Sequence, residues 1–168
     1  VRDGLFERFP MDAIFGMHNW PGMPVGSFAV RNGPCFASSN EFHITIRGKG
    51  CHGAMPHLGI DPVPVACQLV QAYQTILTRN VRPVETGVIS VTMIQAGEAT
   101  NVIPDSVVMQ GTVRTFTTEV LDLIENRMRE ITQQLCAAFG AEADFEFSRN
   151  YPPTVNHAFE AHFVREVM

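Results

Sequence analysis

The sequence lacks several features that would assign it at once to a class of protein. Its 168 residues hold only 12 lysines and arginines against 17 aspartates and glutamates, and the basic residues form no run. Nucleic acid and anionic membrane surfaces are therefore not predicted as partners. No apolar run approaches the roughly 18 residues that a membrane-spanning helix needs. A hydrophobic content of 45% instead predicts one globular domain, or one domain with part of another.

Paired cysteine motifs are also missing. The sequence has four cysteines, which are far apart and form no C-x-x-C. This spacing predicts reduced thiols in a cytoplasmic protein.

Clusters of metal ligands are scarce as well. A zinc site needs three or four ligands from Cys, His, Asp or Glu. Near His18, the sequence offers no H-x-D, no H-x-x-x-H and no Glu-Glu pair. This chain is therefore not expected to complete a catalytic metal site by itself.

What the sequence does have is a clear order of elements from residue 40. Residues 41–47 alternate between polar and apolar side chains, as in a half-buried strand. Asp61-Pro62 has the form of a helix N-cap followed by proline, and apolar residues then recur every three or four positions to about Arg79. The remaining predicted elements are strands at 87–95, 107–116 and 143–147 and a helix between Thr117 and Gly140.

The order β-α-β-β-α-β predicts an α+β, ferredoxin-like fold: a four-stranded antiparallel sheet with two helices on one face. Gly111, within a strand, is expected to mark a bulge or a close approach. Outside this unit, residues 13–17 are predicted to form a short buried strand ending at His18. Residues 151–156 are predicted to be a linker before a last helix.

Five polar residues are candidates for chemistry. His18 is either a structural histidine or a metal ligand. His52 and His57 lie in the loop KGCHGAMPH. They are residues of a surface turn, or they form a two-histidine metal site, or one of them donates a hydrogen bond to a substrate carbonyl. Arg114 either pairs with an acidic residue of the sheet or binds a carboxylate through its guanidinium fork. Asn101 either holds a left-handed turn or contacts a ligand.

The segments FGMHNWPGMPVG, GKGCHGAMPHLGIDPV, TNVIPD and GTVRTF, in this order, closely resemble the amidohydrolase branch of the M20 metallopeptidase family. The resemblance implies an α/β zinc-peptidase-like catalytic domain with an inserted lid or dimerisation domain. It assigns residues 1–35 and 150–168 to parts of the catalytic domain and residues 36–149 to the lid. Because the chain starts with valine and lacks the family's other motifs, we expect it to be a fragment of a longer protein.

The resemblance also implies roles for single residues. His18 matches a metal ligand, and His52 matches a histidine that polarises the scissile carbonyl, often in the partner subunit of a dimer. Asn101 and Arg114 match residues that bind the carboxylate end of the substrate, and His57 is expected to be structural. Cys51 stands where this branch more often has glycine, which leaves the geometry of the loop open.

The function implied for the whole protein is hydrolysis of N-acyl amino acids such as hippurate. Two divalent ions (zinc, manganese, cobalt or nickel) would serve as cofactors, and a homodimer would form through the lid. The fragment alone is expected to be inactive and to bind metal weakly at best. Two alternatives are a ferredoxin-like sensor that binds amino acids without metal, and a module that only dimerises.

Overall fold

The structure, a computed structural model, describes residues 3–168, which divide into two compact units. The larger one, Phe36–Thr154, is called the sheet unit here. The smaller one, called the flanking unit, combines residues 3–35 with Val155–Met168. In this part of the chain, no helix is long and apolar enough to cross a membrane.

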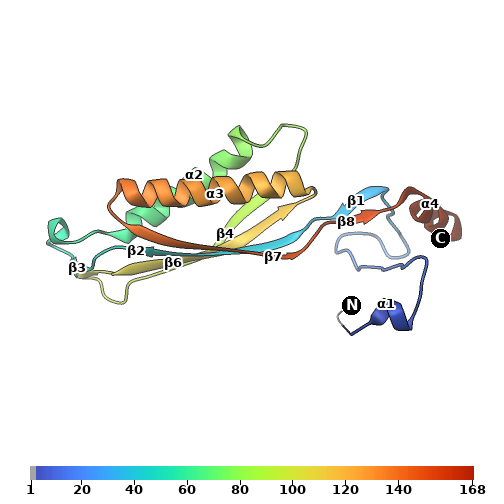
Figure 1. The fold of residues 1–168 in the computed structure, drawn as a ribbon, viewed down its shortest axis with the longest axis horizontal. Helices are drawn as coiled ribbons and strands as arrows, with labels where there is room; N and C mark the ends of the chain where they lie inside the picture. The colour runs from blue at the N-terminus through green and yellow to red at the C-terminus, as the bar shows by residue number, and fades with distance from the viewer. Residues whose placement is uncertain (1–2) are drawn as a thin grey trace. The chain divides into compact units, whose positions relative to one another are not determined.

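The sheet unit contains one four-stranded antiparallel sheet whose strand order is β4-β6-β2-β7. Two long helices, α2 and α3, cover one face of this sheet (Figure 1). The predicted ferredoxin-like fold is thereby confirmed. The bounds are β2 Ser39–Arg47, α2 Pro62–Arg79, β4 Gly87–Ala96, β6 Ser106–Thr115, α3 Thr118–Ala138 and β7 Glu142–Tyr151.

Both helices begin at the residues that the sequence indicates. The Asp61 carboxylate accepts a hydrogen bond from the Val63 main-chain N–H at 3.0 Å, and Pro62 starts α2 without a donor to satisfy. The Thr117 hydroxyl accepts one from the Val120 N–H at 3.3 Å. Gly140, just after α3, has a positive φ of 73°, which glycine adopts without strain.

The core lies between the helices and the covered face of the sheet. Alternate residues of β2, such as Ile44 and Ile46, are fully buried there, while their neighbours on the strand point to the opposite face. Tyr73 of α2 is buried as well, and its hydroxyl bonds the Thr132 hydroxyl of α3 at 2.6 Å. Burial raises the pKa of Tyr73 far above its ordinary value, because the core disfavours the phenolate.

Gly111 marks the close approach that the sequence predicts. A Cβ at this position would lie 2.1 Å from the Ser90 carbonyl oxygen and 2.3 Å from Cζ of Phe42. The Phe42 ring therefore occupies the space that a side chain would need. The bulge lies opposite, on β4, where the register shifts between Val91 and Met93.

The flanking unit contains α1 (Leu5–Arg8) and α4 (Ala158–Val167), and β1 (Gly33–Phe36) pairs with β8 (Thr154–Asn156). The strand predicted at residues 13–17 is wrong. These residues are irregular, and Ile14 and Met17 are 75% and 84% exposed. No neighbouring strand in residues 3–168 pairs with the run, and an apolar run cannot form a stable strand without one. The linker predicted at 151–156 is also wrong in part, since β7 and β8 occupy most of it.

Candidate functional site

Two loops that are distant in sequence meet at one end of the sheet, near the label β3 in Figure 1. We call them the loop pair, residues 48–60 and 97–105. In it, β3 (Cys51–His52) pairs antiparallel with β5 (Val102–Ile103). The Gly53 N–H then donates to the Asn101 carbonyl at 2.7 Å. Two predicted site residues, His52 and Asn101, are therefore brought together.

The glycines of the loop pair permit close contact between its two main chains. The Gly50 N–H donates to the Asp105 carboxylate at 2.8 Å, and a Cβ on Gly50 would lie 2.8 Å from the Ile103 carbonyl oxygen. A Cβ on Gly53 would lie 3.0 Å from the Asn101 carbonyl oxygen. Close approach, rather than an unusual φ, is the reason for glycine at both positions.

Cys51 and Asn101 both have ordinary backbone conformations, since no residue other than glycine has a positive φ in residues 3–168. The interpretation of Asn101 as a left-handed turn residue is therefore wrong. Cys51 fits an extended strand in place of glycine. Its sulfur lies over Gly59, where a Cβ would come within 2.6 Å of it.

His52 is exposed, and its ring has a defined tautomer. The Ala54 main-chain N–H donates to His52 Nδ1 at 3.1 Å, so the neutral ring carries its proton on Nε2. This nitrogen can donate a hydrogen bond outward. His57 is exposed too, and its side chain makes no hydrogen bond within the described chain. The turn is closed by main-chain bonds instead, including Met55 N–H to His52 O at 2.8 Å.

His18, in the flanking unit, has the opposite tautomer. Its Nδ1 donates to the Asn19 carbonyl at 2.7 Å, which leaves the lone pair on Nε2. Its ring also packs edge-on against Trp20, with ring centroids 6.4 Å apart. Metal-binding histidines commonly donate their other N–H to a carbonyl in this way. Residues 3–168 nevertheless contain no group of three or more side chains placed to hold a metal ion.

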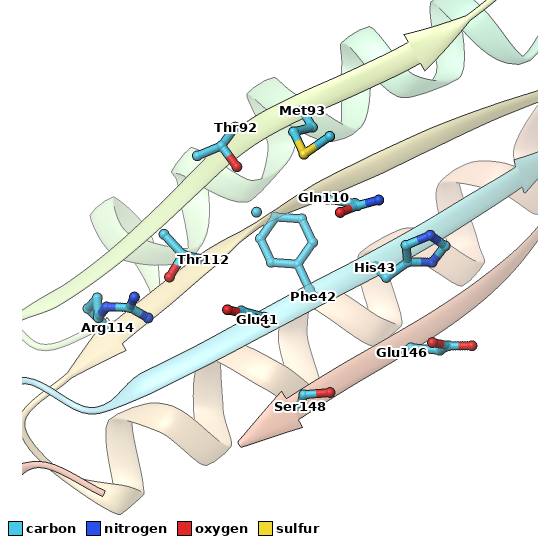
Figure 2. Close-up of a pocket in the computed structure, with 11 residues that line it drawn as sticks. Glu41, Phe42, His43, Thr92, Met93, Gln110, Thr112, Arg114, Glu146 and Ser148 are labelled. Atoms are coloured by element: carbon cyan, nitrogen blue, oxygen red, sulfur yellow. The ribbon is translucent and has the colours of Figure 1, made fainter. Parts of the chain in front are cut away.

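Arg114 lines a pocket of about 360 Å³ on the open face of the sheet (Figure 2). Its Nη1 donates to the carbonyl oxygens of Asn40 and Val113, at 3.2 and 3.1 Å. It forms no ion pair with an acidic residue in the part of the chain that the structure describes. The interpretation of Arg114 as the partner of a sheet carboxylate is therefore wrong, and its charge is available to an anion.

A buried polar network, which sequence reasoning missed, holds this arginine. The Asn40 amide donates to the Ser38 hydroxyl at 2.9 Å and to the Val113 carbonyl at 3.1 Å. The Ser38 and Thr115 hydroxyls lie 3.1 Å apart. The main-chain carbonyl of Asn40 also accepts a hydrogen bond from Arg114 Nη1. The network therefore holds the guanidinium group in place. The polar run Ser38-Ser39-Asn40 before an apolar strand was the available signal.

The pocket also contains residues that the sequence identifies only as the polar face of a strand. Glu41 and His43 come from β2, Glu146 and Ser148 from β7, and Gln110 and Thr112 from β6. Figure 2 shows these side chains along the strands, with Met93 and the bulged residue Thr92 on β4 beside them. Alternation along the strands places them on one face, but only the pairing of the strands shows which of them adjoin Arg114.

The loop pair and Arg114 lie at opposite ends of β6. The strand is 10 residues long, with Ser106 next to the loop pair and Arg114 near its other end. Extended chain rises by roughly 3.4 Å per residue, so Arg114 is on the order of 25 Å along the strand from the loop pair. One molecule therefore does not bring Arg114 together with His52 and Asn101.

The model of the M20 peptidase dimerisation domain matches residues 38–139, most of the sheet unit. The chain belongs to this family. The predicted M20 membership is thus confirmed, and the matched residues include both long helices and the strands β2, β4 and β6 of the sheet.

Curated relatives extend the comparison. The chain is 41% identical to the N-acetyl-L-cysteine deacetylase of Bacillus subtilis over 99% of its own length and 39% of that protein. It is 36% identical to the N-acetyldiaminopimelate deacetylase of Exiguobacterium sibiricum over 93% of its length and 42% of that protein. The chain therefore spans about two fifths of the curated relatives that it matches.

A solved structure agrees with the sequence comparison. The crystal structure of Bacillus subtilis YXEP, described as a dinuclear metal binding peptidase from the M20 family, superposes with a TM-score of 0.69 at 35% identity. The alignment covers 90% of this chain and 36% of that protein.

Proposed function

We propose that the whole protein carrying this chain hydrolyses the amide bond of N-acyl amino acids, with hippurate-like compounds as substrates, in a metal-dependent reaction. The named relatives support the reaction class, because they are deacetylases of N-acetylated amino acids. The observation in this chain that carries the proposal is the His52 tautomer. An exposed Nε2–H donor on a tightly held loop suits a developing oxyanion.

The two ends of the sheet would act on one substrate from two different molecules. His52 and Asn101 of one copy would contact the amide, and Arg114 of the other copy would bind the α-carboxylate. A guanidinium with one nitrogen tied to two carbonyls still has donors for a carboxylate. The separation along β6 supports this arrangement, since a small substrate cannot reach both ends within one molecule.

His18 fits the donor chemistry of one metal ligand, because its lone pair is on Nε2 and its Nδ1–H is held by a carbonyl. The other ligands would have to come from residues that this chain does not supply among those described. Bound divalent ions would supply activated water for hydrolysis. The metal-binding character of YXEP supports this part of the proposal but not a particular metal.

We place the homodimer contact at the edge formed by β4. Val88, Met93 and Ile94 are exposed large apolar residues on this strand, and β4 is one edge of the sheet. The other edge strand, β7, exposes mainly charged side chains, which discourage strand pairing. Val88→Lys should therefore shift the protein toward monomer in sedimentation velocity, whereas Asn150→Lys on β7 should not.

The proposal is tested by hydrolysis of hippurate and N-acetyl amino acids by the full-length protein with added zinc or manganese. His52→Ala should lower kcat by about two orders of magnitude, the usual scale for a lost oxyanion donor. His57→Ala, five positions along the same exposed loop, is the matched control and should leave kcat nearly unchanged. Unchanged turnover in His52→Ala would favour a domain that only dimerises.

Mixing two inactive variants tests the assignment of residues to two copies. In a dimer of His52→Ala and Arg114→Ala subunits, one of the two sites would combine an intact His52 with an intact Arg114. Activity should return to about half of its normal level in such heterodimers. No recovery, despite heterodimers detected by native mass spectrometry, would show that both residues serve the site of their own subunit.

A further inference from the structure

The open-face pocket contains two carboxylates that the proposed function leaves without a role. We propose that Glu41 and Glu146 make this pocket selective for N-acyl amino acids whose side chain ends in a positive charge. This inference rests on the proposed function, because it assigns the α-carboxylate of the substrate to Arg114. It adds the residues that would distinguish one amino-acid side chain from another.

The first support is the position of Glu41 relative to Arg114. Glu41 of β2 pairs with Thr112 of β6, two positions before Arg114, and both side chains line the pocket. Diagonal neighbours of this kind lie roughly 7–8 Å apart. The carboxylate and guanidinium form no ion pair with each other. The gap between opposite charges fits a ligand that carries both an anion and a cation.

The second support is Glu146, which extends the acidic side of the pocket away from Arg114. It pairs with His43, which lies two positions beyond Glu41 on β2. Figure 2 shows Arg114 at one side of the pocket and the His43–Glu146 pair at the other. If the α-carboxylate of a substrate is bound at Arg114, the side chain of that substrate would therefore pass Glu41 first and then Glu146.

Glu41 and Glu146 differ from Asp144, the neighbouring acidic residue on the same face, because they have no cationic partner within residues 3–168. Asp144, two positions before Glu146 on β7, is bound by Arg47, and this contact lowers its pKa below the ordinary range. Glu41 and Glu146 have no such cation among the described residues. Their charge is thus not neutralised within the sheet unit and can attract a cationic group.

The floor of the pocket suits the aliphatic part of a long cationic side chain. Met93, which is 44% exposed, supplies apolar surface on this face, and only the main chain of Gly111 reaches it, since a Cβ on Gly111 would point to the Phe42 ring on the covered face. Lysine-like side chains lay their methylene groups on such surface and keep their charge at the polar end. A volume of about 360 Å³ has room for this group beside its carboxylate.

Binding to the protein itself gives a test that needs no metal and no turnover. Nα-acetyl-lysine and Nα-acetyl-norleucine, which have side chains of similar length, are titrated separately and followed by ¹H–¹⁵N NMR. Acetyl-lysine should bind more tightly, by up to about fivefold for each of the two exposed carboxylates. Glu41→Gln and Glu146→Gln should each reduce the preference and together abolish it. Glu142→Gln, on the same strand and face but outside the pocket, should keep it.

Hydrolysis by the full-length protein separates this inference from the proposed function. Higher kcat/KM for acetyl-lysine than for acetyl-norleucine, lost in Glu41→Gln/Glu146→Gln, would support both. Equal kcat/KM for the two compounds, or equal binding, would overturn the selectivity and leave the hydrolase intact. A binding preference for acetyl-lysine without hydrolysis of either compound would instead overturn the proposed function and keep the pocket. Absence of NMR shifts at the pocket with both compounds would overturn the pocket.

Discussion

The two faces of the four-stranded sheet have opposite characters although they share the same strands. Along β2, Ile44 is fully buried beneath the helices, while Thr45, the next residue, points to the open face. The covered face is apolar and continuous, and the open face carries Arg114 and the pocket carboxylates. The difference indicates that the covered face determines stability, whereas the open face is available for ligand chemistry.

The strongest test of this difference compares adjacent residues on β2. Ile44→Ala removes a fully buried side chain and should lower the free energy of unfolding by about 2–5 kcal/mol. Thr45→Ala should change it by less than about 0.5 kcal/mol. Urea unfolding of the 168-residue protein, followed by circular dichroism, measures both. Similar losses for the two variants would contradict the division between the faces.

Gly111→Ala tests the close packing of β6 against its two neighbouring strands on the covered face. Because the new Cβ would meet the Ser90 carbonyl and the Phe42 ring, we expect a loss of about 2–3 kcal/mol. Gly16→Ala is the control, since no atom lies within 4 Å of the Cβ that it would add. Adding Phe42→Leu to the Gly111→Ala protein should reduce the mismatch at the ring but not at the carbonyl. A Gly111→Ala protein as stable as the control would disprove the close approach.

Tyr73→Phe tests the one phenol on the covered face. Loss of its bond to Thr132 should cost about 1 kcal/mol at neutral pH. Since the folded state raises the pKa of Tyr73, its contribution is fully present below the unfolded pKa of about 10 and declines as pH rises above it. Wild type should therefore lose stability above pH 10 more steeply than Tyr73→Phe. The exposed residue Tyr151 is the control, and Tyr151→Phe should follow wild type.

Asp144→Asn should have the smallest effect, which is present at neutral pH and disappears in acid. The hydrogen bond and charge of Arg47 lower the pKa of this exposed carboxyl. Its contribution is present above the ordinary carboxyl pKa of about 4 and declines as pH falls through the lowered value. Wild type and variant should therefore converge in stability at the lowest pH. Unfolding midpoints measured from pH 2 to 7 would show it, and a constant difference over this range would refute it.

Much of the sheet unit could be predicted from the sequence because its signals are local. Asp61-Pro62 and Thr117 start the helices by short-range hydrogen bonds, and strict alternation identifies β2. The error at residues 13–17 has a different origin. An apolar run reports that a segment favours burial, but a strand also requires a partner strand, which lies elsewhere in the chain.

The candidate site was harder to predict for the same reason. The motifs identify His52, Asn101 and Arg114, but their spacing in sequence does not show that the first two adjoin and that the third lies at the other end of β6. This follows from the β3–β5 pairing and from the register of β6. Glu41 and Glu146 became candidates only when strand pairing placed them beside Arg114.

The placement of Arg114 and the loop pair at opposite ends of one strand has a consequence for the kinetics of the whole protein. In the proposed arrangement each reaction site forms only where two copies meet, so a lone copy would have no complete site. Specific activity would then fall on dilution below the dimer Kd, with the square of protein concentration governing the rate in that range. The total rate of hydrolysis would thus rise more steeply with the amount of protein expressed than it does for an enzyme that works as a monomer.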